Sequence, residues 1–266
     1  MGDKYKGYVI YTDLDGTLLN DKKEVSPQNR EAIERFIEGG GKFAIATGRA
    51  FESIEKYIYG LKMELPSIVY NGGMIYDCID GKIIIEHTLE DHKKQVICKL
   101  TEDYSNLGIE VYCGKDIYVF NDNGMSERQA TSFLNIIYDM PENLFELRWN
   151  KVLLVGEIEF IDELQLIFKE KYNIDVIRSG DRFLEILPNN ISKGQALKEI
   201  IYLYKLDKKK VIAAGDNMND AEMLQECGIS VCPDNASEEV KKYADYITVN
   251  NNIGVIKEIV DFLDER

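Results

Sequence analysis

The chain has 266 residues, of which 45% are hydrophobic and 30% charged, and its formal net charge is −15 at pH 7. This length suits one large domain or two smaller ones, and the composition is typical of a soluble globular protein. No apolar stretch approaches the ~20 residues that span a bilayer, and the first residues lack the apolar core of a secretion signal. The acidic balance, with no basic run beyond Lys208–Lys210, argues against nucleic acid or an anionic membrane as a partner.

The cysteines indicate a reducing compartment. There are five of them, an odd number, and no two form a C-x-x-C pair. This pattern favours reduced thiols and a cytoplasmic location over a disulfide framework.

The first predicted strand is the apolar run 8–11, which leads into Thr12-Asp13-Leu14-Asp15-Gly16-Thr17. Residues two apart on a strand point to the same side, so Asp13 and Asp15 are expected to project together, and Gly16 allows the chain to turn away. Adjacent carboxylates repel each other and cost desolvation, which points to a cation or a reaction at this place. A strand that ends in a polar turn could show the same isolated D-x-D pattern.

Helices and strands then alternate, which predicts parallel pairing through right-handed crossovers. A helix begins at Ser26 and Pro27 and stops at the glycines 39–41. The following elements are a strand at 42–46 ending in Thr47-Gly48-Arg49, a helix at 51–59, and a strand at 67–70 ending in Asn71-Gly72-Gly73.

The middle of the chain has a different pattern. Asp80-Gly81 separates two apolar runs and predicts a hairpin. The expected elements downstream are a helix at 90–106, strands within 109–120, a helix at 126–138, a strand at 151–157, a helix at 161–172, and strands at 174–178 and 183–187. Paired strands between helices indicate an α+β module with an antiparallel sheet, which we place at residues 83–187. Its aromatic residues are expected in the module's core rather than as a substrate platform: Tyr112, Tyr118, Phe120 and Trp149.

The alternation of helices and strands resumes in the last part of the chain. Ser192 is a predicted N-cap, so Lys193 lies in the first turn of a helix at 193–204, where the macrodipole disfavours cations. An anion bound at the helix start would explain a lysine there. A strand at 211–214 runs into the segment Gly215-Asp216-Asn217-Met218-Asn219-Asp220, and helices at 219–226, 236–243 and 253–264 are expected to interleave with strands at 229–231 and 246–249.

The acid pair, Thr47, Lys193 and the acidic segment 215–220 follow one another in an order that resembles the haloacid dehalogenase superfamily of phosphohydrolases. The G-D-N-M-N-D run and the late S-K-G are similar to its Cof-type branch. The resemblance implies an α/β fold: a Rossmann-like parallel-sheet core at 1–82 and 188–266 with an inserted α+β cap domain at 83–187. In that family an insertion between the positions of Thr47 and Lys193 is a sheet-bearing lid. Over the middle module the resemblance is one of layout alone.

The resemblance also implies roles for the residues at the first strand end. Asp13 is the expected nucleophile, which forms an aspartyl-phosphate. Asp15 is the expected general acid and then the base that activates water, and its backbone carbonyl also binds the metal. The amide of Leu14 is expected to face the phosphoryl oxygens.

The predicted metal site consists of Asp13, Asp15, Asp216 and Asp220, with Asp220 either a direct ligand or a support for the others. Hard oxygen ligands, and only two histidines in the chain, both in the middle module, favour Mg²⁺ over zinc.

Four predicted phosphate-binding groups come from three parts of the chain. They are the Thr47 hydroxyl, the Gly48 amide, the Lys193 ammonium and the Asn219 side chain. Arg49 either contacts phosphate or pairs with an acid at the helix start. Asn71-Gly72 either touches the leaving group or forms a plain turn.

These expectations combine into a cytoplasmic, Mg²⁺-dependent phosphatase that acts on small phosphomonoesters such as sugar phosphates or phosphorylated cofactors. The alternatives are a phosphotransferase or mutase with the same intermediate, and a non-catalytic phosphate-binding protein. A receiver-like signalling domain fits less well, because the inserted module and Asp15 have no place in it.

Overall fold

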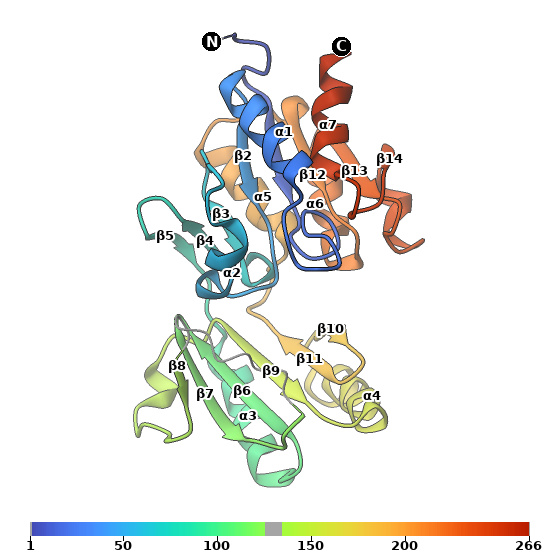
Figure 1. Ribbon diagram of the computed structural model, residues 1–266. Helices are drawn as coiled ribbons and strands as arrows, with labels where there is room; N and C mark the ends of the chain where they lie inside the picture. The colour runs from blue at the N-terminus through green and yellow to red at the C-terminus, as the bar shows by residue number, and fades with distance from the viewer. Residues whose placement is uncertain (1, 126–134, 266) are drawn as a thin grey trace. The chain divides into compact units, whose positions relative to one another are not determined.

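The structure is a computed structural model that describes residues 2–125 and 135–265. The chain forms two compact units, one made of Met1–Ile85 and Ile191–Arg266 and the other of Glu86–Asn190. We call them the core unit and the inserted unit; Figure 1 shows their elements. None of the described helices has both the length and the apolar character needed to cross a membrane.

The core unit is built on a five-stranded parallel sheet in the order β14-β13-β12-β1-β2. Its strands are β1 (Val9–Thr12), β2 (Lys42–Ile45), β12 (Val211–Ala214), β13 (Ile229–Pro233) and β14 (Tyr246–Thr248). The burial of all four residues of β1 and of β12 explains why both strands are continuous apolar runs.

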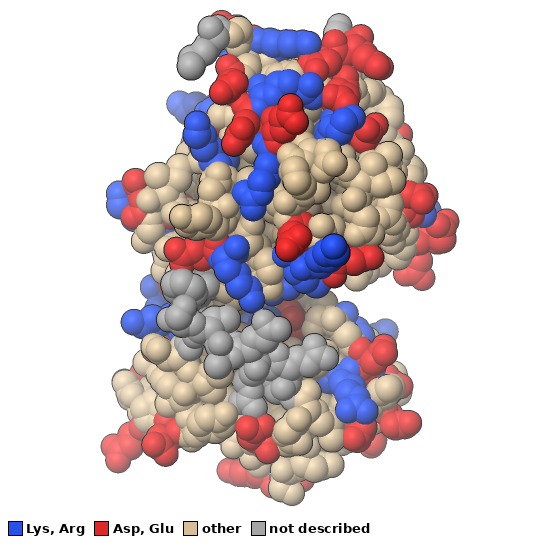
Figure 2. All heavy atoms as spheres, viewed as in Figure 1, with Lys and Arg blue, Asp and Glu red and all other residues tan. Residues whose placement is uncertain are grey.

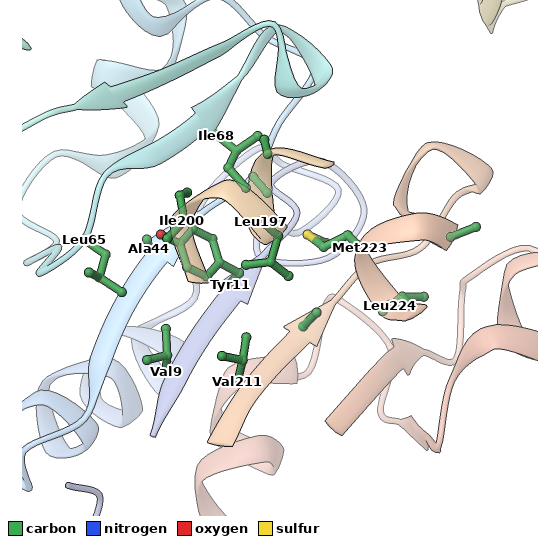
Figure 3. Packing of buried hydrophobic residues seen from close by; sticks show 14 of the residues in the cluster. Val9, Tyr11, Ala44, Leu65, Ile68, Leu197, Ile200, Val211, Met223 and Leu224 are labelled. Atoms are coloured by element: carbon green, nitrogen blue, oxygen red, sulfur yellow. The ribbon is translucent and has the colours of Figure 1, made fainter. Parts of the chain in front are cut away.

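Helices cover both faces of this sheet. They are α1 (Pro27–Glu38), α5 (Lys193–Leu203), α6 (Ala221–Glu226) and α7 (Val255–Asp264), whereas the helix α2 (Phe51–Ile58) stacks its Phe51 on Tyr76. On one face, Val9 and Tyr11 of β1 pack with Leu197 of α5 and Leu224 of α6 in a single buried cluster, which Figure 3 shows from close by. Residues of a strand alternate in direction, so the intervening Ile10 points to the other face, where Figure 1 shows α1 and α7.

A small three-stranded sheet extends the core unit with β3 (Ser67–Val69), β4 (Met74–Asp77) and β5 (Lys82–Glu86). We predicted parallel pairing for residues 67–70, and the structure corrects this in part. Strand β3 joins the main sheet through one parallel bridge between Ala46 and Ile68, and its ladder partner is the antiparallel β4. The chain reverses at once after β3, and this favours the antiparallel partner.

The inserted unit is a six-stranded sheet in the order β10-β11-β9-β6-β7-β8, packed with two helices. Its elements are α3 (Asp91–Asp103), β6 (Gly108–Cys113), β7 (Asp116–Asn121), β8 (Asn135–Ile137), β9 (Lys151–Val155), α4 (Ile158–Ile167), β10 (Ile177–Gly180) and β11 (Phe183–Ile186). All the pairs are antiparallel except β7 with β8. The α/β core with an α+β module confirms the predicted fold class.

Several predicted elements differ in detail. The prediction of a helix at 126–138 is wrong for its last residues, because Asn135–Ile137 pair with β7 as strand β8. The rest of that prediction, residues 126–134, lies outside the described part of the chain. The helix expected at 236–243 is only a 3-10 turn, Val240–Tyr243, and strand β10 starts later than expected. The helix expected at 161–172 is α4 followed by a π-helical turn at Phe168–Tyr172. For residues 135–137 the pairing with β7 outweighs local propensity.

The predicted aromatic core of the inserted unit is correct for three of its four residues. Trp149 is fully buried, and Tyr118 and Phe120 pack in the same cluster. Tyr112 instead donates its hydroxyl proton to Glu110, and its ring lies 4.8 Å from the ammonium of Lys151.

The remaining short turns are 3-10 segments at Tyr70–Gly72, Leu144–Glu146, Lys208–Lys210 and Met218–Asp220. Charges of both signs are interspersed over the face shown in Figure 2, where Lys and Arg form no continuous stripe.

Candidate active site

The carboxyl ends of β1 and β12 bring the acidic motifs together. The amide of Asp13 donates to the carbonyl of Ala214, which fixes the end of one strand beside the other. Gly16 has φ +79, and a Cβ there would overlap the carboxylate of Asp216. Glycine is therefore required at this turn both by the backbone conformation and by the close approach of the second acidic segment.

A fully buried lysine joins the two acidic segments. The ammonium of Lys193 lies 2.6 Å from Oδ1 of Asp13 and 2.6 Å from Oδ1 of Asp220. Ser192 caps helix α5 as predicted, by accepting from the Gln195 amide. The anions that hold a lysine at this helix start are thus two carboxylates of the protein itself, and they raise the pKa of Lys193 despite its burial.

Asp13, Asp216 and Asp220 form an acidic cluster in which one oxygen of each lies within 4.8 Å of the others. Burial, together with the charge of Asp220, raises the pKa of Asp216, and burial raises the pKa of Asp13 even though Lys193 opposes this shift. Three carboxylates share one ammonium, so a further cation would stabilise their ionised form. A hard divalent cation fits this all-oxygen donor set.

The carboxylate oxygens of Asp216 and Asp220 have different partners. Asp220 directs Oδ1 to Lys193, and its Oδ2 accepts from the backbone amides of Asp216 and Asn217. Asp216 accepts at Oδ1 from the hydroxyl of Thr17, at 2.9 Å. Protein donors therefore fix both oxygens of Asp220, and Asp216 is the better placed of the two to bind a cation.

Asp15 lies next to the same strand end, but its carboxylate is surrounded by cations. Arg49 donates from Nε to Oδ2 at 2.6 Å and from Nη2 to Oδ1 at 2.8 Å, and Lys23 donates from Nζ to Oδ1 at 2.8 Å. Burial acts to raise the pKa of Asp15, but these two partners outweigh it and lower the pKa to about 2. Arg49 thus pairs with an acid, but the acid is Asp15 after the end of β1, whereas we expected one at the helix start.

Lys23 was not among the predicted site residues. It lies in the loop after the acid pair, beside the equally basic Lys22. No pattern in the sequence distinguishes these two lysines, because only the fold of the loop decides which of them reaches Asp15.

The other predicted residues gather around the ends of β2 and β3. Thr47 is buried, and its hydroxyl accepts from the amide of Arg49. A Cβ on Gly48 would lie 2.8 Å from the side-chain nitrogen of Asn71. The side-chain oxygen of Asn71 accepts a hydrogen bond from the side chain of Asn219 at 3.0 Å. Hydrogen bonds and close contacts thus link the predicted phosphate-binding segments from three distant parts of the sequence.

Leu14 and Gly72 have clear packing roles. The side chain of Leu14 is fully buried, and its carbonyl accepts from the amide of Leu19. Gly72 has φ +101, and a Cβ there would overlap the carbonyl of Ser192. This contact sets how closely the turn at Tyr70–Gly72 approaches the start of α5.

The parallel-sheet core has an acidic cluster at its strand ends and a buried lysine at a helix start, and an α+β module interrupts it, as the resemblance to the phosphohydrolases implies. The family model of the haloacid dehalogenase-like hydrolases matches residues 10–259, and the chain belongs to this family. It is accordingly a phosphohydrolase.

Known proteins resemble the chain over almost its whole length. It is 27% identical to the 5-amino-6-(5-phospho-D-ribitylamino)uracil phosphatase YwtE of Bacillus subtilis, over 96% of this chain and 97% of that one. It is 28% identical to YitU of the same organism, which is also named a 5-amino-6-(5-phospho-D-ribitylamino)uracil phosphatase, over 92% of this chain and 93% of that one. Among solved structures, TM0651 from Thermotoga maritima has a TM-score of 0.82 and 29% identity, and covers 96% of this chain and 97% of its own.

Proposed function

We propose that the protein is a Mg²⁺-dependent phosphatase that hydrolyses small phosphomonoesters through an aspartyl-phosphate on Asp13. The observation that carries the proposal is the contact of Asp13 with Lys193 beside Asp216 and Asp220. A buried carboxylate held by a lysine next to a cation-binding cluster is suited to attack an anionic phosphorus centre.

In the proposed reaction, an oxygen of Asp13 forms a bond to phosphorus while the bond from phosphorus to the alcohol oxygen breaks. The departing oxygen takes a proton from Asp15. Asp15 then removes a proton from water, whose oxygen attacks the phosphorus of the aspartyl-phosphate, and Asp13 and inorganic phosphate are released. The phosphoryl oxygens would be bound by Lys193, the Thr47 hydroxyl, the amides of Leu14 and Gly48, and Asn219.

The metal site of the proposal consists of the carboxylates of Asp13 and Asp216 and the backbone carbonyl of Asp15, with Asp220 as their support. A bound Mg²⁺ would neutralise charge on the nucleophile and the phosphoryl group. The two fixed oxygens of Asp220 favour its supporting role, because Lys193 and two amides already occupy them.

The inserted unit is proposed as a cap that selects the leaving group. The two Bacillus subtilis relatives are named for a phosphorylated ribityl compound, which supports small phosphorylated molecules such as sugar phosphates as the substrate class. A transferase with the same intermediate would pass the phosphoryl group to a hydroxyl and release no free phosphate.

The test is phosphate release from a panel of phosphomonoesters, with Mg²⁺ or EDTA, using wild type, Asp13→Asn and the control Asp80→Asn. Asp80 lies in the exposed hairpin turn, where its carboxylate pairs with Lys82 and its backbone amide donates to Asp77. We expect Mg²⁺-dependent release from wild type and the control, and less than about one-thousandth of it from Asp13→Asn. Wild-type turnover by Asp13→Asn would exclude the nucleophile, and phosphorylation of an added sugar without free phosphate would favour the transferase.

A further inference from the structure

The carboxylate of Asp15 binds two cations from separate loops. Lys23 donates to Oδ1, and Arg49 donates to both oxygens, all within 2.8 Å. One negative charge therefore faces two positive charges, so this side of the site carries an excess positive charge in a protein whose net charge is −15.

The position of Lys23 is set by a compact turn. Asn20 accepts at its side-chain oxygen from the amides of Lys22 and Glu24, and its carbonyl accepts from the amide of Lys23. Lys23 itself has φ +61, a left-handed conformation that residues with a Cβ rarely adopt.

The same turn is anchored to the last loop of the core unit. Asp21 accepts from the side chain of Asn252 at 3.1 Å, and its amide donates back to Asn252 at 3.0 Å. Asn251 also donates to the carbonyl of Leu19. The loop is thus anchored ahead of Lys23, and this holds the backbone of Lys23 within reach of Asp15.

Both cations remain open to solvent. The side chain of Lys23 is 53% exposed and that of Arg49 is 30% exposed. The guanidinium of Arg49 lies 4.7 Å from the ring centre of Tyr57, so the ring helps to hold it in place. Both side chains can therefore donate to a ligand at this place.

Asp15 supplies one negative charge for these two cations, and among the described contacts the Lys23 ammonium uses one of its three donors, so this place can hold another anion. A neutral alcohol leaving group supplies none, whereas a second anionic group on the substrate does. We propose that the preferred substrates are phosphomonoesters whose leaving group carries a second anion, a carboxylate or a second phosphate, bound by Lys23 and Arg49. This inference rests on the proposed phosphatase function.

The experiment measures kcat/KM for matched esters. Glycerol 3-phosphate is compared with 3-phosphoglycerate, and glucose 1-phosphate with glucose 1,6-bisphosphate, so that the two pairs distinguish a carboxylate from a phosphate as the second anion. The aryl ester 4-nitrophenyl phosphate reports on the phosphatase reaction independently. The proteins are wild type, Lys23→Met, Lys23→Arg and the control Lys22→Met, which removes the same charge from the same turn.

We expect wild type to prefer the doubly anionic member of at least one pair by tenfold or more, on the order of one charge-assisted hydrogen bond. Lys23→Met should lose most of this preference, while Lys23→Arg and Lys22→Met keep it. Hydrolysis of 4-nitrophenyl phosphate without any preference in wild type would overturn the inference alone. A loss of equal size for both members of each pair in Lys23→Met would also overturn it, because Lys23 would then only position Asp15. No phosphate release from any ester would overturn the proposed function together with the inference.

Discussion

Replacing Lys193 by Met tests the charge balance of the acidic cluster. The side chain is completely buried, and methionine fills a similar volume without the ammonium. The change leaves the carboxylates of Asp13, Asp216 and Asp220 within 4.8 Å of one another with no lysine between them. Two charges at that distance repel by about 3.5 kcal/mol at an effective dielectric constant of about 20.

We expect the variant to unfold in EDTA with a free energy lower by about 3–5 kcal/mol, the usual effect of removing one partner of a buried ion pair. The midpoint of thermal unfolding should fall by roughly 10 °C. Added Mg²⁺ should restore more stability to the variant than to wild type, because the variant's folded state offers the cation a more negative site. Phosphatase activity should be lost.

The destabilisation should also depend on pH. Burial raises the pKa of Asp13 in the folded protein, and loss of the lysine would raise it further. A raised pKa makes the protonated acid the better folded form, so the loss of stability should be full above the folded pKa and shrink as the pH falls through it towards the lower pKa of the unfolded chain. The assay is urea unfolding of both proteins at several pH values in EDTA.

A double variant provides the control for this prediction. Adding Asp13→Asn to Lys193→Met removes one of the repelling charges, so the pair of changes should cost less than the sum of the single ones. Wild-type stability of Lys193→Met in EDTA near neutral pH, or strict additivity in the double variant, would refute the reasoning.

Three further predictions follow from other parts of the structure. Gly16→Ala should raise the Mg²⁺ concentration for half-maximal activity about tenfold or more, because its Cβ would displace the Asp216 carboxylate; metal titration of activity checks this. Lys257 and Arg35 hold the pKa of Asp261 below its usual range. The ionised group should therefore stabilise the fold by less than about 1 kcal/mol, and this contribution should be lost as the pH falls. Urea unfolding at several pH values should show no such contribution in Asp261→Asn. Burial raises the pKa of all five thiols, which belong to Cys78, Cys98, Cys113, Cys227 and Cys232. Alkylation of these thiols at about pH 8 should therefore be slow in the native protein and fast in urea, and equal rates would contradict this.

The parallel core could be predicted from the sequence because its signals are local. The run 8–11 is apolar because β1 is buried on both faces, and Ser26 with Pro27 marks the start of α1 through capping chemistry. The strand β8 could not be predicted in this way. Residues 135–137 become a strand only by pairing with β7, a contact that local propensity does not encode.

The same distinction applies to the site. The acid pair follows a strand, and Lys193 begins a helix. Their approximate positions could therefore be inferred from the ends of those elements. The partners of each side chain could not, because they depend on residues far apart in sequence. Lys193 and Asp13 are separated by 180 positions, and Arg49 and Asp15 by 34.

The D-x-D motif therefore separates two environments of opposite charge within three residues. Around Asp13, three carboxylates share one ammonium, which favours the binding of a cation. Around Asp15, one carboxylate shares two cations, which favours the binding of an anion. Under the proposed function, a phosphomonoester with a second anion would satisfy both environments at once: its phosphoryl group would bind beside Asp13, and its second anion would pair with the excess positive charge of Lys23 and Arg49.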